Sequence, residues 1–157
     1  MHPTVSQILV PVDFSAHSEL TVEYAGELAG RLGASVHLLH VVQPIATVAL
    51  GQDGVDLSPL IELEARVAAD AERQMGAIRA ALAASGLTVS SDILTGHPAT
   101  VIVAIARERK RDLIVMGTHG RTGLTHLFMG SVAEKVTRLA PCPVLTVRAL
   151  EWQKAPG

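Results

Sequence analysis

The sequence predicts one α/β domain, built on a five-stranded, mostly parallel, open sheet with helices on both faces. Short apolar runs alternate with longer segments of helical periodicity, and this order produces a doubly wound parallel sheet. Hydrophobic residues make up 48% of the chain and aromatic residues 3%. The core must therefore be aliphatic, as it is in parallel strands that are covered on both faces. The length of 157 residues favours a single domain.

The first part of the chain predicts two strands and a helix between them. Residues 7–12 form a compact apolar run that is typical of a buried strand. Ser15 or Ser18 can cap the following helix, because a serine side chain can accept a hydrogen bond from a free N–H group of the first turn. Gly33 is expected to end this helix. A second strand is predicted over 35–43, where apolar residues are nearly continuous.

A long loop and a long helix are predicted next. Residues 44–57 show no periodicity and contain glycines, so we expect a loop that is long for a compact domain. Ser58 and Pro59 are interpreted as the N-cap and the first residue of a helix that Gly86 ends. One apolar stripe runs along this helix and consists of Leu60, Leu63, Val67, Ala71, Met75, Ile78 and Leu82.

The remaining segments complete the alternation. A more polar third strand over 88–95 is expected at an edge of the sheet. Pro98 opens a third helix, and residues 113–118 form a strongly apolar fourth strand. These are followed by a loop over 120–129, a short helix over 131–139, and a last strand from Val144 to Arg148. The whole chain, residues 1–157, is expected to be one domain with its core over about 7–148 and a frayed tail after Leu150.

Charge and hydropathy restrict the possible partners. The formal net charge of −2 argues against nucleic acid as the main partner, since a surface that follows phosphates has a basic excess. The basic run from Arg107 to Arg111 is interpreted as cations in the last turn of a helix, where they suit the negative end of the dipole. No apolar stretch reaches the roughly 18 residues of a membrane span, and residues 8–12 are too short for a signal peptide. A soluble cytoplasmic protein without a membrane partner is therefore expected.

The one cysteine, Cys142, excludes an intramolecular disulfide and fits a reducing compartment. It lies between two prolines and just before an apolar run. No basic residue lies nearby in the sequence to lower its pKa, so a structural role is expected.

The segment from Gly117 to Ser131 carries the strongest functional signal. It follows a predicted buried strand and ends where a helix begins, which is where α/β sheets bind ligands. Gly117 and Gly120 allow a ligand to approach the main chain closely. Gly130 and Ser131 open a helix whose first N–H groups have no partner within the helix and attract an anion such as phosphate. The pattern G-x2-G-x9-G-[S/T] arises by chance in about one such sequence in a hundred, so glycines that only form turns are the less favoured interpretation.

In this pattern the chain resembles the universal stress protein family, of the UspA type, where G-x2-G-x9-G-[S/T] is the ATP-binding signature. The flanking stretches LIVMGTHGRTGL, MGSVAEKV and APCPVLTVR are similar as well, and ILVPVDFS looks like the family's first strand. The resemblance covers about residues 7–148. It implies a Rossmann-like, adenine-nucleotide alpha-hydrolase-like fold and membership of the ATP-binding subgroup.

The resemblance also implies where the nucleotide binds. Asp13, preceded by Pro11 and Val12, is expected near the nucleotide, and the main chain of Val41 is expected at the adenine edge. The expected ribose contacts are Met116 and Gly117. The phosphates are expected at Gly120, Gly130, Ser131 and Val132, with His119 and Arg121 as further contacts from the loop. The family's last strand commonly pairs with its copy in a second chain, so the strand from Val144 to Arg148 is an expected homodimer edge.

Two residue types allow other interpretations. An aspartate after a buried strand, such as Asp13, often only forms a turn or caps a helix. The seven histidines show no recognised zinc spacing, so no metal site built by the protein alone is expected. His37 and His40 lie three residues apart on a predicted strand and should face opposite sides of the sheet. Any Mg²⁺ is expected to be held by the phosphates of ATP.

These observations favour an ATP-binding regulator of a stress response that is not an efficient enzyme. The chain has no G-x-x-x-x-G-K-[ST] lysine and no paired carboxylates that could act as a general base, although slow hydrolysis by a bound water stays open. A response-regulator receiver is disfavoured, because the third strand ends in Thr95 and the fifth in Arg148, where that domain needs an aspartate and a lysine. An interaction module with a purely structural glycine loop is the remaining alternative.

Overall fold

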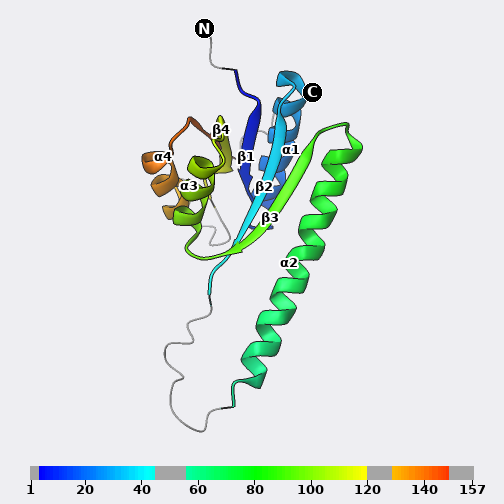
Figure 1. Ribbon diagram of the computed structural model, residues 1–157, viewed down its shortest axis with the longest axis vertical. Helices are drawn as coiled ribbons and strands as arrows, with labels where there is room; N and C mark the ends of the chain where they lie inside the picture. The colour runs from blue at the N-terminus through cyan, green and yellow to red at the C-terminus, as the bar shows by residue number, and fades with distance from the viewer. Residues whose placement is uncertain (1–3, 45–55, 120–128, 149–157) are drawn as a thin grey trace.

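The computed structural model describes residues 4–44, 56–119 and 129–148. Within these ranges strands and helices alternate, and each strand ends within one residue of its predicted bounds. The observed elements are β1 (Gln7–Pro11), α1 (Ala16–Leu32), β2 (Ser35–Val42), α2 (Ser58–Ala84), β3 (Val89–Thr95), α3 (Pro98–Glu108), β4 (Leu113–Gly117), α4 (Ser131–Leu139) and β5 (Val144–Val147) (Figure 1).

All five strands form one parallel sheet in the order β3-β2-β1-β4-β5. The prediction that β3 lies at an edge is confirmed. The chain proceeds outward from β1 to β3 and then returns to the other side of β1 to add β4 and β5. This reversal creates a topological switch point between β1 and β4, and in open α/β sheets a crevice forms there at the carboxyl ends of the strands.

Helices cover both faces of the sheet, as predicted (Figure 1). Ile8 and Val10 of β1 point toward α1 and α2, and Leu9 points toward α3 and α4. All three side chains are fully buried. The core therefore consists of two aliphatic layers that share one sheet, which explains the near absence of polar residues in β1.

The two predicted helix boundaries around α1 are confirmed, and one at α2 is wrong. The Ser15 hydroxyl accepts a hydrogen bond from the N–H of Ser18 at 3.2 Å. Gly33 adopts the left-handed conformation with φ 66° and ends the helix. Ser58 is the first helical residue rather than the N-cap. Its N–H donates to the Asp56 carboxylate at 3.0 Å, so the aspartate two residues earlier stabilises this helix start.

The apolar stripe of α2 has two different environments. Ala71 and Met75 are buried against the sheet, whereas the side chains of Leu63 and Val67 are 50% and 43% exposed. Figure 1 shows the reason, because the N-terminal half of α2 extends past the end of the sheet. Helical periodicity alone predicts one continuous stripe and does not show where the sheet ends.

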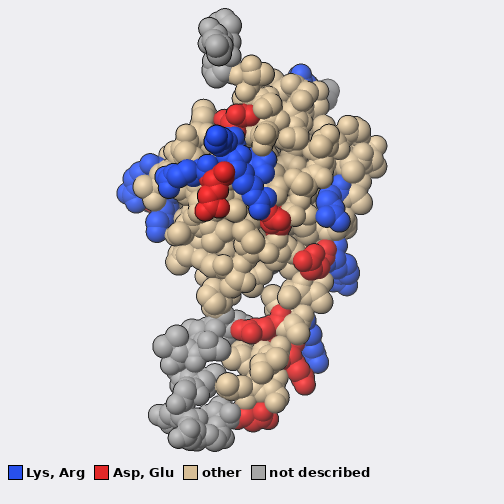
Figure 2. All heavy atoms as spheres, viewed as in Figure 1, with Lys and Arg blue, Asp and Glu red and all other residues tan. Residues whose placement is uncertain are grey.

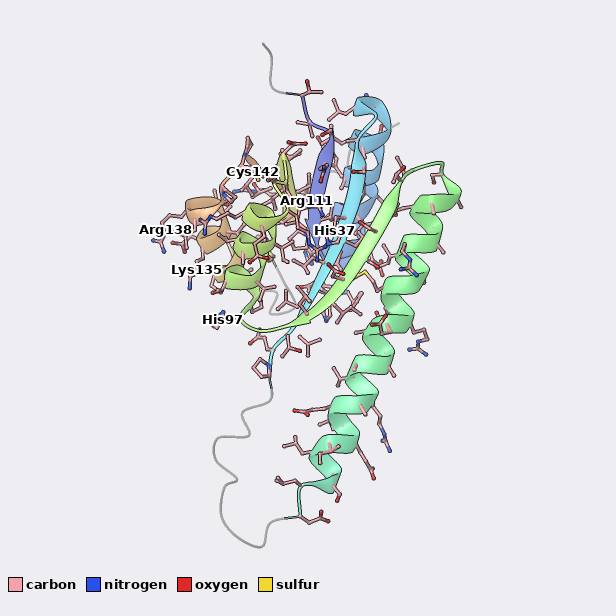
Figure 3. The ribbon with its side chains drawn as sticks, in the orientation of Figure 1. His37, His97, Arg111, Lys135, Arg138 and Cys142 are labelled. Atoms are coloured by element: carbon pink, nitrogen blue, oxygen red, sulfur yellow. The ribbon has the colours of Figure 1, made fainter. Side chains whose placement is uncertain are left out.

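The interpretation of the basic run as helix-end cations is correct only for Arg107, because α3 ends at Glu108. The guanidinium of Arg109 pairs with Asp92 at 2.5 Å, and Arg111 donates to the Gln7 side chain at 2.8 Å. Basic side chains gather on this face with acidic ones among them (Figure 2). Arg111 and His37 lie near each other over the strands, while Lys135 and Arg138 project from α4 (Figure 3).

Among the described helices, none combines the length and apolarity needed to cross a membrane.

Candidate functional site

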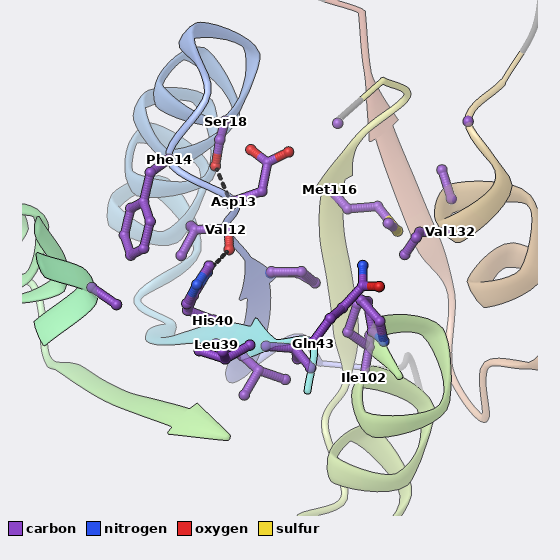
Figure 4. Close-up of a pocket in the computed structure, with 18 of the residues that line it drawn as sticks. Val12, Asp13, Phe14, Ser18, Leu39, His40, Gln43, Ile102, Met116 and Val132 are labelled. Carbon is purple, nitrogen blue, oxygen red and sulfur yellow. Dashed lines mark hydrogen bonds between the residues drawn. The ribbon is translucent and has the colours of Figure 1, made fainter. Parts of the chain in front are cut away.

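The carboxyl ends of β1, β2 and β4 surround a cleft with a volume of about 720 Å³. This volume lies within the range of about 300–1,000 Å³ that is usual for small-molecule sites. The N-terminus of α4 and parts of α2 and α3 complete the walls (Figure 4). The cleft therefore occupies the switch point that the sheet order creates.

Ten of the twelve predicted binding residues line this cleft, although they are separated by up to 121 positions in the sequence. They are Pro11, Val12, Asp13, Val41, Met116, Gly117, His119, Gly130, Ser131 and Val132. The other two predicted residues, Gly120 and Arg121, lie outside the described ranges.

Asp13 forms a turn and also lines the cleft. One carboxylate oxygen accepts hydrogen bonds from the N–H of Ser15 at 3.0 Å and from its hydroxyl at 2.6 Å. The N–H of Asp13 donates to the Ser18 hydroxyl at 3.2 Å. The interpretation of Asp13 as a turn former is thus supported, and the residue also lies in the wall of the cleft.

The end of β1 is fixed by contacts from β2. The N–H of Val12 donates to the carbonyl of Leu39 at 2.9 Å, and the Nδ1 atom of His40 lies 2.8 Å from the carbonyl of Val12. The His40 ring also packs against Phe14, with ring centroids 4.4 Å apart. His37, in contrast, contacts Arg109 at the end of α3. The two histidines therefore face opposite sides of the sheet, as predicted.

The N-terminus of α4 offers main-chain donors to the cleft. Gly130 is the N-cap and supplies no side-chain cap, and the first helical hydrogen bond runs from Glu134 to its carbonyl. The N–H groups of Ser131, Val132 and Ala133 therefore have no acceptor within the helix. Together with the helix dipole, this geometry suits an anionic group.

Gly117 and Gly130 of the motif lack a side chain for different structural reasons. Gly130 has φ −61° and ψ 151°, an extended conformation that any residue adopts. Its lack of a side chain therefore matters for space in the cleft rather than for the backbone. At Gly117, a Cβ atom would lie 3.3 Å from the Thr21 hydroxyl, so tight packing against α1 adds to the close approach that the sequence predicts.

One wall of the cleft is not predicted from the sequence. Helix α2 contributes Arg66, Val67, Asp70, Ala71 and Gln74, and α3 contributes Pro98 and Ile102. The spacing of Arg66, Asp70 and Gln74 at four-residue intervals places them on one helix face. Neither this spacing nor the apolar stripe that contains Val67 and Ala71 reveals that the face borders a cleft.

Cys142 packs against the core beside α3 and α4. Burial and the nearby Asp112 raise the pKa of its thiol. A thiol that stays protonated is a weak nucleophile, which supports the structural role. Within the described ranges, no group of three His, Cys, Asp or Glu side chains could hold a metal ion.

Comparison with known proteins supplies the family. The sequence profile of the universal stress protein family matches residues 4–148. A universal stress protein of Methanocaldococcus jannaschii is 35% identical over 144 residues, which cover 90% of this chain and 81% of that protein. The solved structure of UspA from Lactobacillus plantarum has a TM-score of 0.75 and 33% identity, and the match covers 94% of this chain and 100% of that one.

Other solved structures share the fold. A second universal stress protein of Methanocaldococcus jannaschii matches with a TM-score of 0.79 and 30% identity over 93% of this chain and 97% of that one. Two more distant structures contain nucleotides. One is a universal stress protein in complex with cAMP, with a TM-score of 0.63, 22% identity and coverage of 92% and 98%. The other, from Archaeoglobus fulgidus, is in complex with dAMP, with a TM-score of 0.61, 23% identity and coverage of 91% and 98%.

These matches confirm the predicted Rossmann-like, adenine-nucleotide alpha-hydrolase-like fold. They extend over almost the whole of the region that contains the sheet, the four helices and the cleft. The chain belongs to the universal stress protein family.

Proposed function

We propose that this protein binds an adenine nucleotide, ATP first of all, and acts as a nucleotide-dependent regulator of a stress response. The observation that carries the proposal is the convergence of ten of the twelve predicted binding residues on one cleft at the switch point of the sheet. The complexes of two fold neighbours with cAMP and dAMP support an adenine nucleotide as the ligand class.

Two parts of the cleft suit the two ends of a nucleotide. Aliphatic side chains of Val41, Ile102 and Met116 offer a surface on which a flat base can pack. Beside this surface, the N-terminus of α4 presents main-chain N–H groups that suit phosphates. The Ser131 hydroxyl can add a further hydrogen bond, and Mg²⁺ would be held by the phosphates of ATP.

Regulation rather than catalysis is supported by the acidic groups of the cleft. Of the described lining residues, Asp13 and Asp70 are the carboxylates. Asp13 accepts two hydrogen bonds from Ser15, and Asp70 accepts from Arg73 and Gln74. Neither arrangement resembles a carboxylate poised to activate water, so we propose at most slow hydrolysis. Turnover above about one per second would instead favour an ATPase.

We further propose a cytoplasmic homodimer that forms through β5. Within the described residues, β5 pairs with β4 on one side only and lies at the edge of the sheet. A second copy can add its own β5 to this edge through main-chain hydrogen bonds.

The proposal is tested by isothermal titration of Mg-ATP into nucleotide-stripped protein, followed by competition with AMP and cAMP. We expect a micromolar Kd, which corresponds to roughly −8 kcal/mol. Gly130→Val should weaken binding by about tenfold or more, because it adds a branched side chain to the wall of the cleft at the N-cap of α4. Gly76→Val is the matched control, since a Cβ atom added at Gly76 would meet no atom within 4 Å and this residue does not line the cleft. Absence of binding in the unmodified protein would instead favour the interaction module with a structural glycine loop.

A further inference from the structure

The cleft crosses the end of the sheet, and strand alternation divides its lining into two parts. Leu39 and Val41 point toward α3 and α4, whereas His40 points to the opposite face, toward α1 and α2. We call the part lined by Leu39, Val41, Ile102, Met116 and Val132 the nucleotide lobe. We call the part lined by Phe14, His40, Val67, Ala71 and Gln74 the second lobe. Figure 4 shows Val12 and Asp13 between Phe14 and His40 on one side and Met116 and Val132 on the other.

The second lobe has the chemistry of a site for a flat ring. Phe14 and His40 supply two aromatic rings in contact, with centroids 4.4 Å apart. Val67 and Ala71 supply an aliphatic wall, and the Gln74 amide, whose nitrogen donates to Asp70 at 2.7 Å, also lines this lobe and keeps its oxygen as an acceptor. Stacking on such rings and hydrogen bonding to an amide are the interactions by which proteins hold a nucleobase.

The backbone of Phe14 supports a role for its ring. Phe14 has φ 62°, a left-handed conformation that is disfavoured for a bulky residue. Such conformations persist where the surrounding structure holds them, and they cluster at ligand sites. Here the conformation brings the ring against His40 at the edge of the second lobe.

Charge disfavours a phosphate in the second lobe. Of the described residues that line the whole cleft, Arg66 is the cation. It adjoins Val67 of the second lobe, and its guanidinium lies 3.9 Å from the Glu62 carboxylate. Arg66 also lies one helical turn from Asp70, which lines the same wall. The positive charge is thus matched by neighbouring carboxylates, and the uncharged floor of the lobe favours a ring over an anion.

We propose that the second lobe binds the second base of a dinucleoside polyphosphate whose first base occupies the nucleotide lobe. The proposal rests on the proposed adenine-nucleotide function. The two lobes belong to one continuous cleft, so a single ligand can reach both. Because the Asp13 carboxylate lies between them, a phosphate chain that crosses this point needs Mg²⁺ to offset its charge.

The test compares diadenosine tetraphosphate with ATP in titrations that contain Mg²⁺. We expect the dinucleoside to bind about tenfold more tightly or better, a difference of about 1.4 kcal/mol, with one ligand per chain. Val67→Trp should fill the second lobe and bring the ratio of the two affinities to about one. Ile61→Trp is the matched control, because Ile61 is 63% exposed on the same helix and does not line the cleft. This control should bind diadenosine tetraphosphate more tightly than ATP by the same factor as the unmodified protein.

Phe14→Gly provides a second variant that is compatible with the left-handed backbone and removes the stacking ring. It should also reduce the ratio to about one. The proposal is overturned if ATP binds but the dinucleoside binds no more tightly, or if the advantage survives both Val67→Trp and Phe14→Gly. One dinucleoside per two chains would overturn it as well, because the ligand would then bridge two nucleotide lobes. If neither compound binds, the proposed function itself fails.

Discussion

The imidazole of His37 and the guanidinium of Arg109 meet although 72 positions separate them in the sequence. The Nε2 atom of His37 lies 3.2 Å from Nη1 of Arg109, and this same Nη1 lies 2.5 Å from the Asp92 carboxylate. Nε2 also lies 3.3 Å from the Asp92 carboxylate. A guanidinium can only donate, so the contact with Arg109 favours a neutral, accepting Nε2, whereas the carboxylate favours a protonated one. The Nδ1 atom lies 2.7 Å from the Ser90 hydroxyl. The contacts of His37 with Arg109 and Ser90 together connect the end of α3 to β2 and β3.

Protonation of His37 should destabilise the fold. Burial, followed by the charge of Arg111, lowers the pKa of His37 below its ordinary value. The folded state therefore binds this proton less readily than the unfolded chain, whose histidine titrates near pH 6.5. The stabilising contribution is complete above about pH 6.5 and is lost as the pH falls through the lower, folded-state pKa.

We therefore expect the free energy of unfolding to decrease between about pH 7 and pH 5, with a contribution from His37 of at most about 1.4 kcal/mol per pH unit. Urea unfolding of the unmodified protein and of His37→Gln across this range measures the contribution. The variant should show a shallower dependence on pH. Equal slopes in the two proteins would assign the pH dependence to other groups.

A second prediction concerns Asp112, which anchors the start of β1. Its carboxylate accepts hydrogen bonds from the N–H of Ser6 at 2.9 Å, from the Ser6 hydroxyl at 2.8 Å and from the N–H of Gln7 at 2.9 Å. These bonds, those from Ser6 above all, lower the pKa of Asp112. Asp112→Ala should reduce the free energy of unfolding by about 1–2 kcal/mol at neutral pH. Glu108→Ala, at an exposed position nearby, should change it by less than about 0.5 kcal/mol. Equal effects of the two substitutions would show that the anchor contributes nothing.

The third prediction uses two glycines of α1. At Gly30 a Cβ atom would meet only the tip of Leu87 at 3.9 Å, whereas at Gly26 it would approach the tip of Leu82 to 2.8 Å. Alanine is preferred over glycine within a helix by roughly 0.5–1 kcal/mol, so Gly30→Ala should stabilise the protein by about that amount. Gly26→Ala should stabilise the protein by about 1 kcal/mol less than Gly30→Ala does, because Leu82 must move out of its packing against α1. Thermal unfolding of both variants provides the comparison, and a larger gain for Gly26→Ala would contradict the close packing of α1 on α2.

The sequence predicts features that are encoded locally. The strands and helices are identified from the periodicity of apolar residues, and the Ser15 cap and the Gly33 terminus from the chemistry of single residues. The role of Arg109 is different, because its partners His37 and Asp92 come together only through the register of β2 with β3. Local patterns contain no information about that register, so the basic run is interpreted as a helix end.

The same reasoning explains which walls of the cleft the sequence identifies. Gly130 is found because it belongs to the glycine motif at the start of a helix, whereas Asp13 is assigned to the site through the family resemblance. The order of the sheet brings the two residues to one cleft. The wall from α2 is missed because it depends on how far that helix extends past the sheet. Gln74 and Val67 carry no motif, and their place in the cleft follows from the packing of α2 on β2 and β3.

The last prediction tests the proposed dimer edge at β5. The carbonyls of Pro143 and Val147 accept hydrogen bonds from β4 at 3.0 and 3.1 Å, so residues of this parity direct their main-chain groups toward β4. Thr146 has the opposite parity, and its N–H group is directed to the outer edge. A proline at position 146 removes a donor from that edge without removing a hydrogen bond to β4. Thr146→Pro should therefore convert a dimer into a monomer in sedimentation equilibrium while the thermal midpoint changes little. Leu145→Pro removes an N–H group that is directed toward β4, so this control should instead unfold the edge of the sheet. A dimer that survives Thr146→Pro would exclude β5 as the interface.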